Sequence, residues 1–378
     1  MRDACALLVY DFRASGVVRN TLRIATAARD AGLDVSLWPI RLQGELVGDI
    51  PAGMALQPIL EGPSRAQRDL DSLRAIPALV RAINRRRPRV LFSGGNHTHF
   101  HAALALQFAM DRAALCFIGR ASNAVISGED GGYWHKLVGP FERFQYASMN
   151  RIAAVSNELE NAIVDRLEID GDRVTTIPNG VDLAGIATAA REPVSHHFFA
   201  EGEPPVILGI GRISRQKNFK GLIRAFAILR ATTPARLLIL GPGTGRRVQR
   251  LRALAARLGI GPDVDFPGFV PNPPAWLARA SQFVLSSRWE GASNVLLEAL
   301  ACGCPVVATR APTGVAEVLL NGRVGPLVPV GDDDALAQAM LARLAQPRAI
   351  ETLRARAADY DLARMLAAYV DLLKRARR

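Results

Sequence analysis

The sequence predicts an α/β protein made of two doubly wound domains in series. Short apolar runs alternate with helical patterns, which is typical of mostly parallel sheets with helices on both faces. The 378 residues are enough for two domains, each with its own core. The alternation breaks once, near residue 183, and then restarts. We therefore expect an N-terminal domain over residues 1–184 and a C-terminal domain over residues 185–359.

The first half of the chain contains four apolar runs of strand length. The first, ACALLVY, is followed by a helical pattern that stops at Gly32, and glycine commonly ends helices. The later runs are bounded by glycines or by polar residues that begin a helix. The predicted strands are 4–10, 33–40, 89–95 and 150–156, and the predicted helices are 15–32, 96–110 and 157–169.

The second half repeats the alternation after a break. IPNGVD, at 177–182, has turn composition, and REPVSHHFFAEGEPP, at 191–205, is typical of a linker. The last segment, about 360–378, is an amphipathic helix that either domain could hold, and we place it with the first. The predicted strands are 205–211, 236–243, 264–270, 281–287 and 304–309, and the predicted helices lie in 212–230, 246–260, 273–280 and 293–302.

The composition is that of a soluble globular enzyme with excess positive charge. Hydrophobic residues make up 49% and charged residues 22%, and no apolar run approaches the roughly 18 residues of a membrane span. The net charge is +12, and residues 186–378 carry 26 Lys and Arg against 15 Asp and Glu. The sequence has no zinc finger, aromatic RNA-binding motif or dense basic arm, so we expect no nucleic acid partner. Solvated arginine-rich helix faces account for most of the excess.

Two basic clusters favour contact with an anionic membrane surface. The clusters are Arg85, Arg86 and Arg87, and, near the C-terminus, Lys374 and Arg375. The N-terminal apolar stretch is too short for a secretory signal, so we expect a cytoplasmic protein, peripheral on the inner face of the plasma membrane.

The four cysteines are scattered, which fits a reducing compartment. Cys302 and Cys304 stand too close together for a usual zinc or disulfide framework. We expect them to be small buried residues.

The stretch RWEGASNVLLEALACGCPVVAT places Glu290 and Glu298 eight positions apart. Glu290 follows a predicted strand, and Ser293 is a plausible N-cap of the next helix. Gly291 and Ala292 allow backbone N–H groups to approach a diphosphate, and a helix N-terminus favours anions. Eight helical residues rise about 12 Å, comparable to the distance from a sugar to a ribose across a diphosphate. One carboxylate can then accept hydrogen bonds from sugar hydroxyls and the other from ribose hydroxyls.

A second motif, GIGRISRQKNFKGLI, also follows a predicted strand. Arg212 and Lys217 place two cations on a strand-to-helix loop, which suits a diphosphate that gains charge as a leaving group. Alone, the two residues would be ordinary surface cations. Because the carboxyl ends of parallel strands meet at one edge of a sheet, we expect both motifs to converge there.

Together these motifs resemble family four of the retaining glycosyltransferases. GRISRQKN, the Glu290–Glu298 pair with NVLLEALACGCPVV, and IPNGVD carry the resemblance over residues 150–335, while the first 150 residues match mainly in pattern. The resemblance implies the GT-B fold, in which two Rossmann-like domains face each other across a cleft. It makes 1–184 the acceptor-binding domain and 185–359 the nucleotide-sugar donor domain.

The resemblance also implies roles for individual residues. Arg212 and Lys217 match the basic pair on the donor diphosphate, Glu290 the glutamate near the donor sugar, and Glu298 the ribose-binding glutamate. The candidate catalytic residues are Arg212, Lys217, Glu290 and His97. Further donor-binding positions lie in loops around the sugar, diphosphate and base: Gly16, Gly211, Gly241 with Pro242, Phe269, Val270, Gly291, Ala292, Ser293, Asn294 and Val295.

The N-terminal half departs from the family pattern. The family's paired-glycine loop with a following acid is replaced by RASGVVRN, with Ser15, Gly16 and Val18. Glu129 and Asp130 could position an acceptor hydroxyl, or Asp130 could cap a helix.

Three histidines stand two residues apart in SGGNHTHFHA. His97 is the candidate for the family's histidine near the donor sugar, with His99 next. His97 and His101 could bind a metal ion on one helical turn, but no acidic or cysteine partner is evident nearby. We expect no metal, and His101 is expected on the helix surface.

The expected function is transfer of a hexose or N-acetylhexosamine, with retention, from a nucleotide sugar to a glycan or lipid-linked acceptor in surface polysaccharide or lipopolysaccharide biosynthesis. A UDP-sugar is the expected donor, and no cofactor is expected. The alternatives are a nucleotide-sugar 2-epimerase and a non-catalytic nucleotide-sugar binding protein. A dinucleotide-dependent oxidoreductase is disfavoured because GPGTGRR has the wrong glycine spacing.

Overall fold

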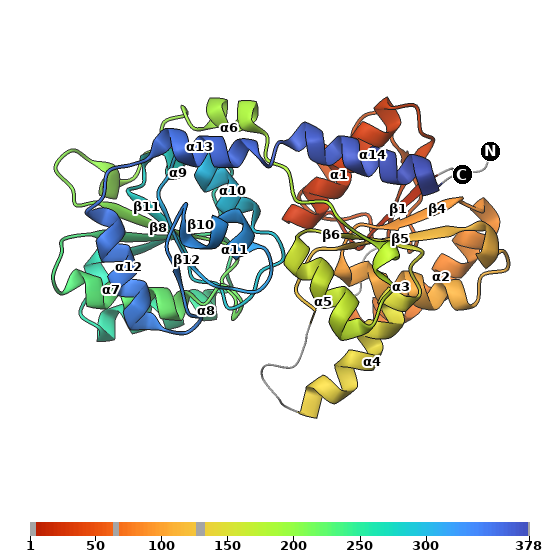
Figure 1. The fold of residues 1–378 in the computed structure, drawn as a ribbon, viewed down its shortest axis with the longest axis horizontal. Helices are drawn as coiled ribbons and strands as arrows, with labels where there is room; N and C mark the ends of the chain where they lie inside the picture. The colour runs from red at the N-terminus through yellow and green to blue at the C-terminus, as the bar shows by residue number, and fades with distance from the viewer. Residues whose placement is uncertain (1–4, 63–67, 126–132, 377–378) are drawn as a thin grey trace. The chain divides into compact units, whose positions relative to one another are not determined.

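The computed structural model describes residues 5–62, 68–125 and 133–376 (Figure 1). The chain divides into two compact units: unit 1 is Met1–Asn179 with Ala363–Arg378, and unit 2 is Gly180–Leu362. The chain therefore passes from one unit to the other twice. The first passage lies five residues before the boundary expected from the sequence, and the C-terminal segment belongs to unit 1.

Unit 1 contains a parallel sheet whose described strands run in the order β3-β2-β1-β4-β5-β6-β7. The strands are β1 (Cys5–Val9), β2 (Val35–Pro39), β3 (Ala55–Leu56), β4 (Val90–Ser93), β5 (Cys116–Ala121), β6 (Arg151–Ala154) and β7 (Val174–Thr176). The helices are α1 (Gly16–Asp30), α2 (Arg68–Arg86), α3 (Asn96–Gln107), α4 (Tyr133–Ala147), α5 (Asn157–Leu167) and α14 (Leu362–Ala376).

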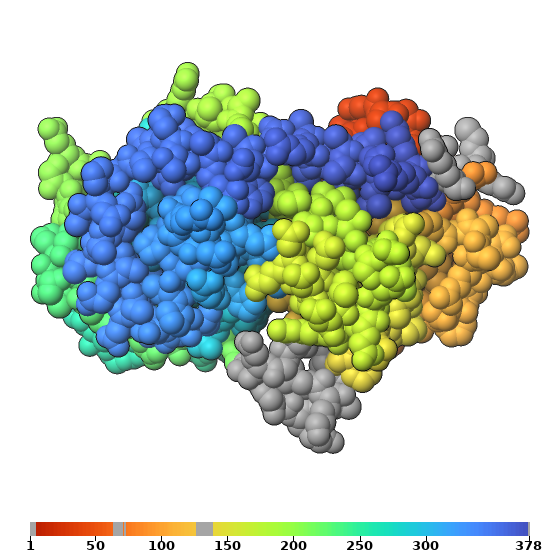
Figure 2. Space-filling view, in the orientation of Figure 1, coloured from red at the N-terminus to blue at the C-terminus, as the bar shows by residue number. Residues whose placement is uncertain are grey.

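Helices cover both faces of this sheet. Helices α1 and α14 lie on one face and α2 to α5 on the other (Figure 1). The outer side of α14 forms part of the surface and is dark blue in Figure 2. Because both faces are covered, the central strand β1 is a continuous apolar run, and every residue of it is buried.

Local sequence signals explain where the helices of unit 1 begin and end. Ser15 precedes α1, and its side chain accepts a hydrogen bond from Val18 N at 3.3 Å. Gly32 follows α1 with a φ of +79°, a conformation that glycine adopts without strain. Ser156 caps α5 in the same way, accepting from Leu159 N at 3.1 Å.

Strand β5 has no counterpart among the strands expected from the sequence. Its residues are CFIGRA, and Gly119 with Arg120 interrupts the apolar pattern. A Cβ on Gly119 would lie 2.2 Å from Met149 Sδ, so glycine is what allows Met149 to pack against the strand. Both residues weaken the sequence signal for a buried strand.

Unit 2 contains a second parallel sheet, with its described strands in the order β10-β9-β8-β11-β12-β13. The strands are β8 (Val206–Ile210), β9 (Arg236–Leu240), β10 (Val264–Gly268), β11 (Gln282–Leu285), β12 (Val306–Thr309) and β13 (Leu327–Val328). The helices are α6 (Leu183–Ala189), α7 (Phe219–Arg230), α8 (Gly245–Arg257), α9 (Pro273–Arg279), α10 (Asn294–Ala301), α11 (Val315–Val318), α12 (Asp333–Leu344) and α13 (Ile350–Ala358).

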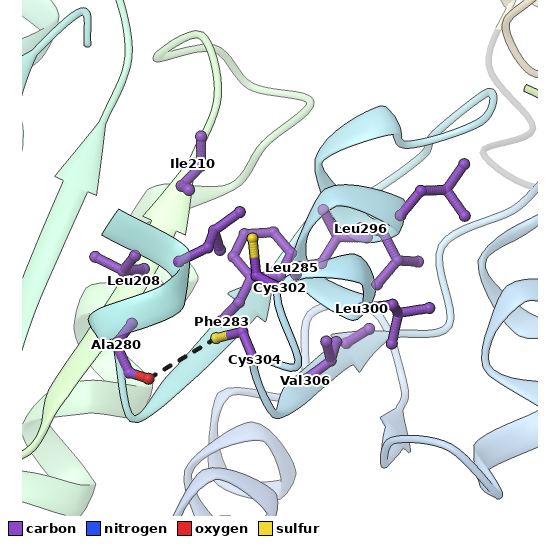
Figure 3. Packing of buried hydrophobic residues seen from close by; sticks show 14 of the residues in the cluster. Leu208, Ile210, Ala280, Phe283, Leu285, Leu296, Leu300, Cys302, Cys304 and Val306 are labelled. Atoms are coloured by element: carbon purple, nitrogen blue, oxygen red, sulfur yellow. Dashed lines mark hydrogen bonds between the residues drawn. The ribbon is translucent and has the colours of Figure 1, made fainter. Parts of the chain in front are cut away.

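Two apolar clusters hold the helices of unit 2 against its sheet. One packs α7, α8 and α12 on one face, and the other packs α6, α9, α10, α11 and α13 on the opposite face. Cys302 and Cys304 lie in the second cluster, as expected (Figure 3). Burial raises the pKa of each thiol to about 12, so both remain protonated.

The expected linker at residues 191–205 is wrong. Phe198 is 4% exposed and belongs to the apolar core of unit 2. His196 Nε2 lies 3.2 Å from Asp265 Oδ2, and its ring meets Trp276 edge to face. The segment is polar in composition, but its few aromatic residues anchor it to unit 2.

Candidate functional site

The two motifs of unit 2 lie where the strand order of its sheet reverses. Strands β8 and β11 are neighbours, and the order runs outward from them in opposite directions. The loops that follow them, residues 211–218 and 286–293, therefore leave the same edge side by side. In open α/β sheets, ligands bind at such a switch point. This edge is the candidate functional site of unit 2.

Lys217 and Glu290 form an ion pair in this site. Lys217 Nζ lies 2.6 Å from Glu290 Oε1, and the two side chains are 16% and 7% exposed. Ser287 Oγ donates to the same carboxylate oxygen, and Thr313 Oγ1 donates to Glu290 O at 2.8 Å. Because the pair is largely removed from water, each charge depends on the other. The two motifs thus present a cation and a carboxylate at one point.

Hydrogen bonds between the two loops hold this pair in place. Arg288 N donates to Gln216 O at 2.7 Å, and Gln216 Nε2 donates to Trp289 O at 3.0 Å. Ser286 Oγ donates to Lys217 O at 2.8 Å. The sequence analysis missed these positioning side chains. Most stand inside the motifs, beside the charged residues, but Thr313 is 23 residues from Glu290 and carries no sequence signal.

Close backbone approach explains two of the predicted glycines. Gly211 has a φ of +147°, and a Cβ there would lie 2.8 Å from Lys217 Cε. A Cβ on Gly241 would lie 2.2 Å from the carbonyl oxygen of Gly211. Only glycine fits both positions without moving the loop or Lys217.

The N-terminus of α10 lies next to the ion pair. Ser293 stands at the N-cap position, as predicted, but its side chain makes no capping hydrogen bond. Its hydroxyl is buried and has no hydrogen-bond partner among the described residues. A buried unsatisfied hydroxyl is costly, so a ligand with hydrogen-bonding groups would be stabilised here. Gly291 and Ala292 precede it, and Asn294 and Val295 form the first helical positions.

The estimate of about 12 Å between the two glutamates assumed helix along the whole interval. That assumption does not hold, because α10 begins only at Asn294 and residues 291–293 are not helical. Glu298 is half-buried on α10, and its charge adds to the burial that raises the pKa of Cys302.

The remaining predicted donor residues lie at the same edge of unit 2. Arg212 lies two residues after the end of β8 and is exposed, with no hydrogen bond or ion pair to any residue that the structure describes. Phe269 follows β10 and is 57% exposed, whereas Val270 packs against the core. Arg212 and Phe269 are thus available to a ligand.

Unit 1 has its own switch point, between β1 and β4. Gly16 begins α1, the first helix after β1, and His97 lies in the first turn of α3, the helix that follows β4. A Cβ on Gly94 would lie 2.3 Å from Thr21 Oγ1, and one on Gly95 would lie 2.5 Å from Val17 Cγ1. The segment after β4, residues 94–95, is therefore pressed against α1, which brings Gly16 and His97 to one edge of unit 1.

The three histidines have different environments. His97 is exposed, so of the three it is the accessible candidate. His99 is fully buried, and its Nδ1 lies 2.7 Å from Ser93 Oγ. The surface position expected for His101 is wrong, because it is 6% exposed and meets Tyr10 edge to face.

We expect His99 to make stability depend on pH. Burial lowers the pKa of His99 to about 3 from its usual 6.5, so the folded state binds fewer protons than the unfolded state between these values. The stabilisation is complete above pH 6.5 and is lost as pH falls towards 3, with a slope of up to about 1.4 kcal/mol per pH unit. Urea unfolding of His99→Asn should show a weaker pH dependence than the wild type. The exposed His197→Asn is the control, and equal slopes in all three proteins would contradict the prediction.

Two further expectations concern metal binding and the acidic loop at Glu129 and Asp130. Within the described ranges, no three His, Cys, Asp or Glu residues are grouped so that they could hold a metal ion. Glu129 and Asp130 lie outside the described residues.

Comparison with known proteins assigns both halves of the chain. Residues 14–184 match the family described as glycosyltransferase family 4, and residues 204–346 match glycosyl transferases group 1. The chain belongs to glycosyltransferase family 4. This family 4 protein is similar to the Anabaena protein HepE, solved with UDP and glucose, with a TM-score of 0.78 and 17% identity over 98% of this chain and 99% of that chain. Its fold is GT-B, as the resemblance implied.

Two curated relatives of the family 4 chain are informative. It is 33% identical over 178 residues, 47% of this chain and 46% of that protein, to N-acetylgalactosamine-N,N'-diacetylbacillosaminyl-diphospho-undecaprenol 4-alpha-N-acetylgalactosaminyltransferase of Campylobacter jejuni. It is 28% identical over 323 residues, 81% of this chain and 76% of that protein, to D-inositol 3-phosphate glycosyltransferase of Pseudarthrobacter chlorophenolicus. The chain thus spans about half the length of the Campylobacter relative.

Proposed function

We propose that this protein is a retaining glycosyltransferase that moves a hexose or N-acetylhexosamine from a nucleotide sugar to a glycan or lipid-linked acceptor. The observation that carries the proposal is the Lys217–Glu290 ion pair beside the N-terminus of α10, at the switch point of unit 2. A cation and a helix N-terminus suit a diphosphate, and a carboxylate suits sugar hydroxyls. The unsatisfied Ser293 hydroxyl adds support, because a phosphate oxygen would satisfy it.

In the proposed reaction, the bond between the anomeric carbon and the diphosphate oxygen breaks, and the electron pair leaves with the nucleotide diphosphate. The acceptor hydroxyl oxygen forms its bond on the same face, and its proton passes to the leaving diphosphate. Lys217, Arg212 and the α10 N-terminus stabilise the leaving group. Glu290 and His97 are proposed beside the donor sugar, and Glu298 on the ribose.

We propose that no metal ion is needed. Two cationic side chains and a helix N-terminus would neutralise the diphosphate, the task that a divalent cation performs in other transferases. The use of EDTA in the donor experiment tests this directly.

A donor screen tests the proposed function. Thermal shift and donor consumption are measured with UDP-, GDP- and ADP-sugars in the presence of EDTA, and UDP-sugars come first because the Anabaena structure contains UDP and glucose. We expect one nucleotide to raise the melting temperature and its sugar to be hydrolysed slowly, since water replaces the missing acceptor. Conversion of the sugar without release of nucleotide would indicate a 2-epimerase. Stabilisation without any turnover, even with acceptor, would indicate a binding protein.

The acceptor and the cellular location of the protein are also proposed. The name of the Campylobacter relative includes a diphospho-undecaprenol acceptor, so we propose a lipid-linked acceptor and a role in surface polysaccharide or lipopolysaccharide synthesis. The protein would then work in the cytoplasm, at the inner face of the plasma membrane. No helix in the described ranges has the length and hydropathy of a membrane span.

The basic clusters of unit 1 are the proposed membrane contact. Arg85, Arg86 and Arg87 are exposed at the end of α2, and Lys374 and Arg375 are exposed near the end of α14. Both ends border one cavity of about 450 Å³, which is lined by Arg87, Arg89 and Ala376 among others. The two clusters therefore belong to one surface, which suits anionic headgroups.

Vesicle sedimentation tests this contact. We expect binding to phosphatidylglycerol vesicles but not to phosphatidylcholine vesicles, and a large loss of binding in Arg85→Glu/Arg86→Glu. Arg250→Glu/Arg257→Glu makes the same charge change on exposed residues of α8 in unit 2 and is the control. Equal losses in both double variants would show that net charge, and not this surface, is responsible.

A further inference from the structure

One arginine of unit 1 is buried without an acidic partner. Arg120, near the carboxyl end of β5, is 1% exposed. Its Nε donates to Tyr369 OH at 3.1 Å, Nη2 donates to Asn179 Oδ1 at 2.5 Å, and Nη1 approaches Gly94 O at 3.4 Å. No carboxylate of the described residues forms an ion pair with it. The guanidinium therefore has only neutral hydrogen-bond acceptors.

This arrangement is expensive for a protein that only needs to fold. A buried charge without a counter-charge costs several kcal/mol, and apolar residues of similar size often stabilise such positions as well or better. Burial also raises the pKa of the Tyr369 phenol, so the hydroxyl stays neutral and supplies no charge to offset the arginine. Packing alone does not explain an arginine here.

The three acceptors lie either close to His97 or close to a point where the chain passes between the two units. Gly94 lies in the short segment between β4 and α3, three residues before His97 in the first turn of α3. Asn179 is the last residue of unit 1 before the first passage, and Tyr369 lies on α14, which follows the second. Arg120 thus joins the segment before the first turn of α3 to two others. These are the segment where the chain leaves unit 1 and the segment where it re-enters unit 1.

The segment between β4 and α3, which leads to His97, is closely packed. Gly94 and Gly95 press against α1, Gly94 N donates to Leu8 O at 3.1 Å, and Ser122 N donates to Asn96 Oδ1 at 2.9 Å. Arg120 holds the opposite side through the Gly94 carbonyl. The charge of Arg120 also adds to the burial that keeps His99 of α3 unprotonated.

We propose that Arg120 is a positioning residue for transfer: it ties the segment that leads into the first turn of α3, where His97 lies, to Asn179 and Tyr369, which makes α14 part of the transfer machinery. The inference rests on the proposed function. It assigns to the C-terminal helix a role that its amphipathic sequence does not suggest. Because most of the proposed donor-binding residues lie in unit 2, disturbing this contact should affect the transfer step more than donor binding.

Tyr369→Phe tests the contact with the least disturbance. It removes the hydroxyl and keeps the ring, which meets Phe92 edge to face at 5.9 Å. We expect kcat for transfer to fall about tenfold, the lower range for a hydrogen bond to a charged group, with a smaller change in the donor KM. The ratio of donor hydrolysis to transfer should rise, because a misplaced turn orients the acceptor poorly and water competes.

Tyr360→Phe is a matched control. The Tyr360 hydroxyl accepts a hydrogen bond from Arg356 Nη2 at 2.8 Å, the same chemistry in unit 2. It should reduce stability to a similar degree but leave the hydrolysis-to-transfer ratio unchanged. In an Arg120→Met background, Tyr369→Phe should have no further effect, whereas Tyr360→Phe should remain additive.

Amide hydrogen exchange tests, independently of activity, whether Arg120 holds the segment around Gly94. Amides of residues 94–98 should exchange faster in Tyr369→Phe than in the wild type, and those of β8 should not change. Wild-type kinetics together with wild-type exchange at 94–98 would overturn the proposal. A wild-type protein without any transfer activity would refute the proposed function instead, and the exchange result would still decide whether Arg120 holds the turn.

Discussion

A Lys217→Ala variant is expected to lose about 100- to 1,000-fold in kcat for transfer, the range seen when one group that stabilises developing negative charge is removed. Lys217 is the cation that the two loops of unit 2 hold beside Glu290 at 2.6 Å. In the proposed reaction the diphosphate gains charge as it departs, so the loss should appear mainly in kcat. Single-turnover measurements with saturating donor test this.

The Lys217 variant needs two controls. Lys220→Ala removes the same charge three residues further on, from an exposed position, and should retain activity. Lys217→Ala also leaves the Glu290 carboxylate buried without its partner, which costs roughly 3–5 kcal/mol in stability. The double variant Lys217→Ala/Glu290→Gln removes both charges. Because Glu290 is itself a proposed catalytic residue, the double variant is used for stability alone, and it should recover part of the free energy of unfolding that Lys217→Ala loses. A Lys217→Ala protein that is folded at the assay temperature and still slow assigns the loss of kcat to lost charge stabilisation; one that is unfolded there would contradict it.

The second large effect is expected at Glu298. Glu298→Ala should lower kcat/KM for the donor by about 100-fold, because hydrogen bonds from ribose hydroxyls to a carboxylate contribute on the order of 1.5–3 kcal/mol each. The protein should remain folded, since Glu298 is half-buried on a helix whose apolar face makes the core contacts. Isothermal titration with the free nucleotide diphosphate measures the binding part of the effect.

A deoxyribose donor distinguishes ribose recognition from a general disturbance. The wild type should discriminate against the 2′- or 3′-deoxy donor, and Glu298→Ala should lose this discrimination. Glu351→Ala, on the neighbouring α13 and with a side chain 89% exposed, is the control and should behave as the wild type. Equal discrimination by wild type and Glu298→Ala would remove Glu298 from the ribose site.

The sequence by itself determined the fold class, two doubly wound domains in series, and the main residues of the candidate site of unit 2. Continuous apolar runs such as CALLV predict parallel strands, because such strands are buried on both faces. Ser15, Gly32 and Ser293 marked helix boundaries, because local backbone geometry sets the preference for caps and stops. Motifs that follow strands predicted convergence at one edge, because all the strands are parallel.

Only the tertiary structure decided which side chains meet. Thr313 reaches Glu290 from 23 residues away, and Arg120 meets Tyr369 from 249 residues away, distances along the chain at which local patterns carry no information. Polar composition suggested a linker at 191–205, but the burial of Phe198 in a distant core overrides it. Periodicity likewise cannot tell His97 from His101 on one helix. Burial is set by the neighbouring elements, and those are placed by contacts far apart in the sequence.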